Sequence, residues 1–168
     1  MKENGVPAER DNPGVIALPP LLYSAAFLVV LALNWLLPFQ IVKQTVALWV
    51  GVALLVVGAC IGLWGQRTMR AAGTSVHPSE PTTAIVTRGP FRFSRNPLYV
   101  ALTLLYLGLS LAVNTWWGLI ALVPLLFTMH YGVVLREERY LERKFGDTYR
   151  EYRVKVRRYL VPGRNPIS

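Results

Sequence analysis

Long apolar stretches alternate with short charged segments along this chain. Three windows hold no Asp, Glu, Lys or Arg: residues 12–42, 44–66 and 96–135, which are 31, 23 and 40 residues long. A helix of about 20 apolar residues crosses a hydrocarbon core about 30 Å thick. The first two windows each hold one such stretch, and they predict membrane-spanning helices over residues 21–39 and 45–64.

The third window, residues 96–135, is too long for one crossing. As a single helix its 40 residues would reach about 60 Å, because each residue adds about 1.5 Å. The chain must therefore fold back, and Asn114-Thr115 is the turn signal near the middle of the window. Two further helices are expected over residues 98–113 and 116–135. The sequence thus predicts an all-α polytopic membrane helix bundle with four membrane-spanning helices.

The basic residues lie on one side of such a bundle. With four crossings, the N-terminal segment 1–20, the loop 65–97 and the tail 136–168 share a side, and together they hold 17 of the 18 Lys and Arg residues. Basic residues accumulate in the cytoplasmic loops of membrane proteins. This asymmetry predicts an integral membrane protein with both termini in the cytoplasm and with Lys43 on the opposite side.

The first 20 residues differ from a signal peptide. They carry acidic as well as basic side chains, and no small-residue cleavage site follows the apolar run. We expect a mobile N-terminal leader over residues 1–20, followed by one membrane domain over residues 21–168.

Composition narrows the classes of function. Only 16% of the 168 residues are charged, against roughly 25% in soluble domains, and disorder and coiled coils are excluded. The single cysteine excludes a multi-cysteine metal site, and no metal is expected. The net charge is +9. Because the basic residues border the membrane, we expect anionic inner-leaflet lipids as partners and no nucleic acid.

The tail carries an amphipathic pattern. Residues separated by steps of three and four form one face: Glu138, Leu141, Phe145, Tyr149, Tyr152 and Val156. This pattern predicts a C-terminal amphipathic helix at the membrane interface, with a break at Gly146 and a new N-cap at Asp147. Glu137 and Glu138 are adjacent, so on a helix they point about 100° apart and should have different partners.

The loop before the third span combines turn formers with arginines. Arg88, Arg92 and Arg95 alternate with two phenylalanines, and Pro97 suits the first position of a helix. A basic interfacial loop accounts for the arginines and phenylalanines, but not for the Gly-Pro and Asn-Pro pairs. In the fourth span, His130 should face protein or a wet cavity. A structural hydrogen bond and a ligand contact both remain open for this histidine.

Two motifs together resemble a known family of membrane enzymes. The segment GPFRFSRNPLY is followed about 40 residues later by REERYLERKFGDTYREYRVKVRRYLVP. In order and spacing these are similar to the integral membrane methyltransferases that include isoprenylcysteine carboxyl methyltransferase and phospholipid methyltransferases. The residues that match the pattern are Arg95, Pro97, Tyr99, Glu137, Glu138, Leu141, Phe145, Gly146, Tyr149 and Tyr152. The chain departs from the family at Asn96, where histidine is common, and asparagine cannot titrate near neutral pH.

The resemblance implies transfer of a methyl group from S-adenosylmethionine to a lipid or isoprenoid-linked acceptor at the cytosolic interface. It implies catalytic roles for Arg95 and Glu138. It implies a cofactor site made of Arg95, Asn96, Pro97, Tyr99, His130, Glu137, Glu138, Tyr149 and Tyr152. Arg92 and Arg153 are the candidates for binding an anionic substrate group. Of the two glutamates, we expect Glu137 to bind the donor and Glu138 to hold an arginine of the loop.

Two other classes of function stay open at this point. Sterol reductases that use NADPH carry a similar C-terminal motif, although they are generally larger. A non-enzymatic lipid-binding membrane protein is the other alternative. That alternative predicts that Glu137 and Glu138 are both exposed and free of arginine contacts.

Overall fold

The computed structural model describes residues 12–77 and 80–159, and every regular element in this part is helical. The elements are α1 (Pro19–Leu36), α2 (Gln44–Ala71), the 3-10 helix η1 (Gly89–Arg92), α3 (Pro97–Ala112), α4 (Trp116–Met129), the π-helical turn η2 (His130–Val134), α5 (Leu135–Phe145) and α6 (Asp147–Lys155). The predicted all-α class is confirmed. Most of the expected leader, residues 1–11, and the end of the tail, residues 160–168, lie outside the described residues.

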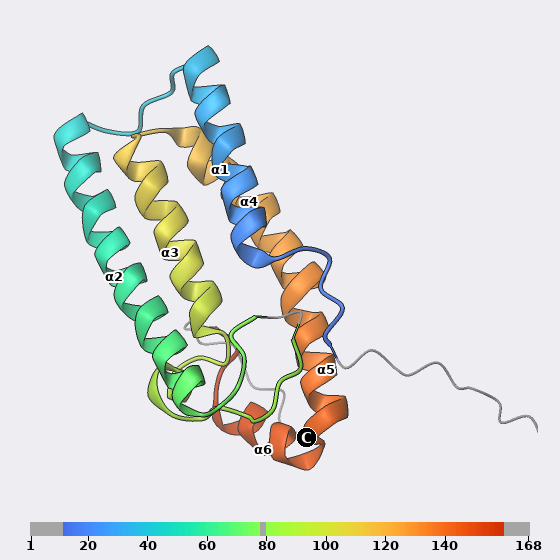
Figure 1. Ribbon diagram of the computed structural model, residues 1–168. Coiled ribbons are helices and arrows are strands. Elements are labelled where there is room, and N and C mark those ends of the chain that lie inside the picture. Colours follow the sequence, from blue (N-terminus) through green and yellow to red (C-terminus); the bar gives the residue numbers. More distant parts are fainter. Residues whose placement is uncertain (1–11, 78–79, 160–168) are drawn as a thin grey trace, which may run out of the picture.

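The helices α1 to α4 run side by side as a bundle (Figure 1). Within the described residues, three helical stretches are long and apolar enough to cross a membrane: α1, α2 and the continuous run Trp116–Phe145. The fourth apolar helix, α3, has 16 residues. The four expected helices are present and apolar, but α3 is shorter than the three stretches that are long enough to cross a membrane.

Two helix ends differ from the sequence prediction. Helix α2 continues to Ala71 rather than ending at residue 64, because residues 65–71 contain no proline and the backbone leaves the helical region only at Gly73, whose φ is 68°. The fourth helix does not end at residue 135 but continues through η2 and α5 to Phe145. In both cases the apolar stretch ends before the helix does. The last turns of each helix carry charged residues and lie beyond its apolar stretch.

The predicted break at Gly146 is present, but the predicted cap is wrong. Gly146 has a φ of 52°, which glycine adopts at little cost, and it occupies the N-cap position of α6. Asp147 is therefore the first helical residue and not the cap. The amphipathic stretch is divided at this point, with α5 continuing the fourth helix and α6 folding back beneath it (Figure 1).

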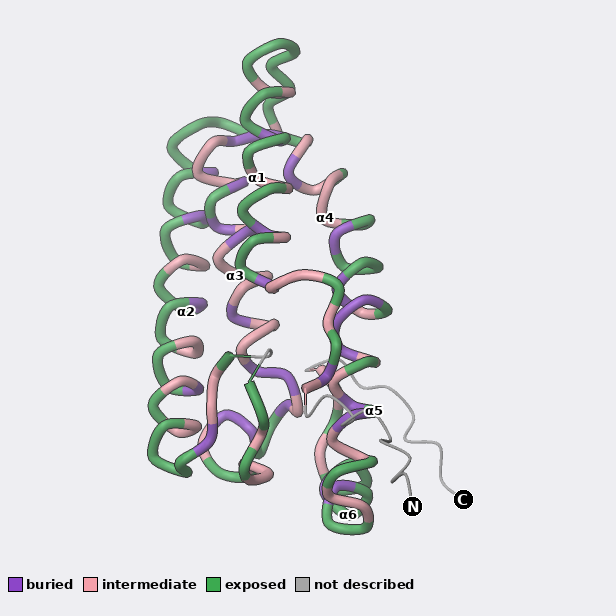
Figure 2. Tube along the Cα trace, turned by 45° about the vertical axis from the view of Figure 1, so that its right-hand side comes forward, coloured by how far each residue is buried: buried purple, intermediate pink, exposed green. Residues whose placement is uncertain are grey.

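Helices α2 and α3 pack through small residues. A Cβ atom added to Gly51 would lie 2.7 Å from the carbonyl oxygen of Gly108, and one added to Gly58 would lie 3.1 Å from that of Ala101. Glycine thus lets the two backbones approach, as is common between helices in lipid. The outward faces of α1 and α2 remain largely exposed, and their buried positions face inward (Figure 2).

The two ends of the bundle carry different structural elements. At one end, Asn114 has a φ of 56° and Thr115 caps α4, which confirms the hairpin expected there. The side-chain amide of Asn114 also forms hydrogen bonds with the backbone of Ile41 and Val42. These bonds join the turn between α3 and α4 to the segment between α1 and α2. At the opposite end lie the loop between α2 and α3, together with α5 and α6 (Figure 1). Most of the candidate residues belong to this second end.

Candidate functional site

A cavity of about 780 Å³ lies where the loop, α5 and α6 meet the bundle. We call it the loop-end cavity. Its walls come from the start of α1, the end of α2, the loop residues 74–77 and 80–86, the first turns of α3, and α5 and α6. Eight of the nine residues expected to bind a cofactor line it: Arg95, Asn96, Pro97, Tyr99, Glu137, Glu138, Tyr149 and Tyr152.

Glu138 is the centre of a buried ionic cluster. Its Oε1 lies 3.1 Å from Nη1 of Arg95, and the two side chains are only 9% and 8% exposed. Arg158 donates to both carboxylate oxygens, at 2.9 and 2.7 Å. Such charge-assisted, bidentate contacts are the strong class of hydrogen bond and fix orientation. The expected contact between Glu138 and an arginine of the loop is therefore present, and Arg158 adds a second one.

Arg95 keeps one hydrogen-bond donor without a partner. Its Nη1 contacts Glu138 and the hydroxyl of Tyr149, the latter at 3.4 Å, whereas its Nε is buried and has no acceptor. Buried polar groups almost always have partners, because leaving one unpaired costs free energy. Arg95 lines the loop-end cavity, but with other atoms of its side chain, because Nε has almost no accessible surface.

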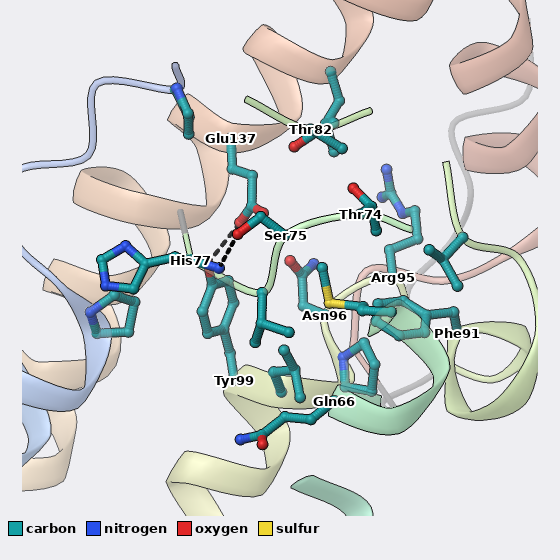
Figure 3. Close-up of a pocket in the computed structure, with 18 of the residues that line it drawn as sticks. Gln66, Thr74, Ser75, His77, Thr82, Phe91, Arg95, Asn96, Tyr99 and Glu137 are labelled. Atoms are coloured by element: carbon teal, nitrogen blue, oxygen red, sulfur yellow. Dashed lines mark hydrogen bonds between the residues drawn. The ribbon is translucent and has the colours of Figure 1, made fainter. Parts of the chain in front are cut away.

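Glu137 also lines the loop-end cavity, with a different environment from that of Glu138. Its Oε2 accepts a hydrogen bond from the hydroxyl of Tyr99 at 2.7 Å, and the two side chains point toward one another (Figure 3). Among the described residues no Lys or Arg forms an ion pair with Glu137. A cation bound in the cavity could therefore pair with this carboxyl group. The two adjacent glutamates do have different partners, as their helical positions predicted.

Asn96 joins the loop to the C-terminal segment that follows α6. Its amide nitrogen donates to the carbonyl of Arg158 at 3.1 Å, and Ser94 donates to the same carbonyl at 3.0 Å. The backbone N–H of Arg95 donates to the carbonyl of Arg157 at 2.8 Å. These bonds hold the Ser94–Asn96 turn in place, and Pro97 then begins α3.

The two tyrosines of α6 close the loop-end cavity from below. Burial is the main cause that raises the pKa of Tyr149 to about 12, so its phenol stays neutral beside Arg95 at physiological pH. Tyr152 donates its hydroxyl to the carbonyl of Phe91 at 2.8 Å, and burial also raises its pKa. Tyr152 therefore holds the loop against α6.

Three candidate residues lie elsewhere. Arg92 is exposed at the end of η1. Arg153 pairs with Glu142 at 3.0 Å on the outer surface of the α5–α6 corner. His130 lines a second cavity, of about 480 Å³, between α1, α3 and the fourth helix. We call this second one the interhelical cavity. Its lining includes Tyr99, which therefore borders both cavities.

Sequence reasoning missed several participants. Arg158 and Tyr159 follow the last helix, and their contacts with Glu138 and His130 arise from the way the chain returns after α6. Gln66 and Thr74 line the loop-end cavity because α2 extends past its predicted end (Figure 3). One sequence signal could have indicated the role of Arg158. Two arginines, at 157 and 158, directly follow the apolar stripe that ends at Val156.

The combined charges suit a particular kind of small molecule. The loop-end cavity is lined at one point by the cationic side chain of Arg95 and at another by Glu137, a carboxylate without an ion-pair partner among the described residues. A molecule with both a carboxylate and an ammonium group could satisfy the two at once. The volume of about 780 Å³ lies within the range of about 300–1,000 Å³ that is typical of small-molecule sites.

Comparison with known proteins gives one informative match. A family model described as phospholipid methyltransferase matches residues 46–148, from the start of α2 to the start of α6. A Haemophilus influenzae protein without a functional name is 36% identical over 63 residues, which cover 38% of this chain and all of that protein. No solved structure matches the chain.

Proposed function

Since this chain belongs to the phospholipid methyltransferase family, we propose that it moves a methyl group from S-adenosylmethionine to a membrane lipid. In this proposal the donor binds in the loop-end cavity and the lipid enters through the interhelical cavity. The observation that carries the proposal is that one cavity is lined both by the guanidinium-bearing side chain of Arg95 and by Glu137, whose carboxylate has no ion-pair partner among the described residues.

The residues of the loop-end cavity fit this donor. Its amino-acid end is a zwitterion, so Arg95 would bind the carboxylate and Glu137 the ammonium group. Its sulfonium carries the methyl group to be transferred, and it would be favoured near the faces of Tyr99 and Tyr149. The Asn96 amide nitrogen is engaged by Arg158, which leaves its carbonyl oxygen as an acceptor for a hydroxyl or amino group of the donor.

The interhelical cavity supports a lipid acceptor. Its lining is mostly apolar and belongs to helices that are apolar enough to lie in a membrane. Tyr99 borders both cavities, so the donor's reactive end and a lipid headgroup would meet beside this residue. Holding two reactants in contact converts a bimolecular encounter into an effectively unimolecular step, and a methyl transfer gains most from that positioning.

Glu138 acts in this proposal as a positioning residue. Its three contacts with Arg95 and Arg158 hold the guanidinium of Arg95 at the cavity wall and fasten the chain that follows α6. The proposed orientation has this end of the bundle in the cytoplasm, where a polar donor is available. A non-enzymatic lipid-binding role predicted exposed glutamates without arginine contacts, and the burial of Glu138 against Arg95 disagrees with that prediction. Family membership does not favour the reductase alternative.

A transfer assay tests the proposal. The purified full-length protein in lipid nanodiscs is incubated with methyl-labelled S-adenosylmethionine, and the lipid extract is analysed by mass spectrometry. We expect a labelled lipid with the wild type, a much lower yield with Glu137→Gln, and a normal yield with Glu142→Gln. Glu142 is the matched control because it pairs with arginines outside both cavities. The absence of any labelled lipid with the wild type would refute the proposal.

A further inference from the structure

We infer that the corner between the end of α2 and η1 binds the headgroup of an anionic phospholipid of the surrounding membrane. We call this corner the arginine–aromatic surface, and its members are Trp64, Arg67, Arg88, Arg92 and Phe93. None of these five residues lines the loop-end cavity or the interhelical cavity. The inference therefore goes beyond the proposed function, and the lipid bound here is not the acceptor of the methyl group.

Helix η1 packs closely against the end of α2. A Cβ atom added to Gly89 would lie 2.6 Å from Oγ1 of Thr68 and 3.1 Å from Nε1 of Trp64. Gly89 has a φ of 58°, which suits glycine, so this residue permits the close approach. As a result the rings of Trp64 and Phe93 lie side by side, with their centroids 6.5 Å apart.

Three arginines border this aromatic pair. Arg67 follows Trp64 by three residues, which places it on the same side of α2. Arg88 directly precedes η1, and Arg92 ends it beside Phe93. All three arginines are exposed, and none of them forms an ion pair with another described residue. The arginines of the loop-end cavity and of the α5–α6 corner, by contrast, are paired with glutamates.

Acidic residues are absent from the sequence around this surface. No Asp or Glu occurs between Lys43 and Glu80, or between Glu80 and Glu137. The carboxylate of Glu80 itself accepts a hydrogen bond from the hydroxyl of Ser75. The surface thus carries three positive charges without an internal counterion, which favours an anionic partner. Phosphate oxygens suit it best, because a guanidinium can bind two of them at once.

The aromatic pair favours a lipid over a soluble anion. Trp64 and Phe93 are 48% and 61% exposed, although both side chains are large and apolar. Val57 and Val50, seven and fourteen residues before Trp64, are also exposed and lie on the same side of α2. Trp64 therefore stands where an exposed apolar face of α2 reaches the arginines, a position typical of the membrane interface. An acyl chain would cover that face, and a soluble phosphate would leave it bare.

Helix η1 lies between the arginine–aromatic surface and the loop-end cavity. Phe91 lines that cavity (Figure 3), and its carbonyl accepts the hydrogen bond from Tyr152, whereas Arg92 and Phe93 are exposed. A lipid bound at the surface would hold η1 against α2 from the outside. We accordingly expect an anionic lipid to raise Tm, because a ligand of the folded state stabilises that state.

Binding of phosphatidylglycerol tests the inference. The full-length protein in detergent micelles is titrated with phosphatidylglycerol or with phosphatidylcholine of the same acyl chains, and native mass spectrometry counts the bound lipids. We expect a phosphatidylglycerol adduct, and a rise in Tm, at concentrations where phosphatidylcholine gives neither. One arginine near an anionic surface contributes about fivefold in affinity, so Arg67→Gln or Arg92→Gln should weaken binding about fivefold and Arg67→Gln/Arg88→Gln/Arg92→Gln about 10²-fold.

A matched control removes three positive charges elsewhere. The variant Arg139→Gln/Arg150→Gln/Arg153→Gln changes α5 and α6 only, and it should bind phosphatidylglycerol as the wild type does. The substituted side chains are exposed in both triple variants, so both should melt as the wild type does in lipid-free detergent. Equal weakening in the two triple variants would show a response to net charge alone and would overturn the site.

The remaining arms separate a lipid from a soluble anion. Trp64→Ala/Phe93→Ala keeps the three arginines and should still weaken phosphatidylglycerol binding. Glycerol 3-phosphate, which has the phosphate but no acyl chains, should not displace the lipid. Displacement by glycerol 3-phosphate, or equal adducts with the two lipids, would overturn the inference. The proposed function stands or falls separately, because no methyl donor takes part and neither cavity is altered.

Discussion

Replacing Glu138 with Gln should destabilise the protein strongly, because Glu138 neutralises a buried arginine. The side chains of Glu138 and Arg95 are 9% and 8% exposed, and Arg158 is 34% exposed. Removing one partner of a buried ion pair costs about 3–5 kcal/mol. Arg158 is partly exposed, so water can solvate its charge once Glu138 is replaced, and its share of this cost is smaller than that of Arg95. For a chain of this length about 3 kcal/mol corresponds to a fall of about 6–12 °C in Tm.

Thermal unfolding in detergent, followed by tryptophan fluorescence, measures this change. The double variant Glu138→Gln/Arg95→Gln removes both charges, so it should lose less than the sum of the two single variants. Glu142→Gln is the control, since its partners Arg150 and Arg153 are largely exposed, and it should melt as the wild type does. A Tm for Glu138→Gln within 2 °C of the control, or additive losses in the double variant, would contradict this reasoning.

Three further predictions concern Glu137, the membrane topology and Tyr149. Glu137→Gln should raise the Kd for S-adenosylmethionine in equilibrium dialysis while leaving Tm unchanged; a fall in Tm with an unchanged Kd would reverse the roles of the two glutamates. A cysteine introduced at Lys43 should react with an impermeant reagent added outside cells and one at Lys155 should not, and the opposite pattern would invert the topology. Burial raises the pKa of Tyr149 from 10.0 to about 12, so stability that is complete below pH 10 should fall as the pH rises through 12. Tyr149→Phe should reduce that fall in alkaline unfolding titrations, and an unchanged slope would show that Tyr149 is not the group responsible.

The helices and the glutamate pair could be predicted from the sequence because their signals are local. Windows without charge define where the chain can cross a membrane, and Asn114-Thr115 marks the turn between two crossings. The 100° step between Glu137 and Glu138 follows from helix geometry alone. Helix ends were less well predicted, because α2 continues to Ala71 on residues that are polar but not helix-breaking.

The contacts of the C-terminal segment could not be predicted, since they depend on how the chain returns after Gly146. Arg158 meets Glu138 across 20 positions, and Tyr159 meets His130 across 29. Neither spacing follows from a helical period, because α6 ends at Lys155 and Val156 is extended. The separation of the two cavities also depends on how the chain packs and could not be predicted from local sequence. His130 was grouped with the cofactor residues because its position facing the interhelical cavity appears only once the helices are packed.

Equilibrium binding of labelled S-adenosylmethionine to the purified protein tests the central claim most directly. The account predicts saturable binding to the wild type that excess NADPH does not displace. Arg95→Ala should weaken it by more than tenfold, because a charge-assisted contact worth ~1.5–3 kcal/mol is lost, whereas Glu142→Gln should bind as the wild type does. Displacement by NADPH, or an unchanged affinity in Arg95→Ala, would contradict the assignment of the loop-end cavity to the methyl donor.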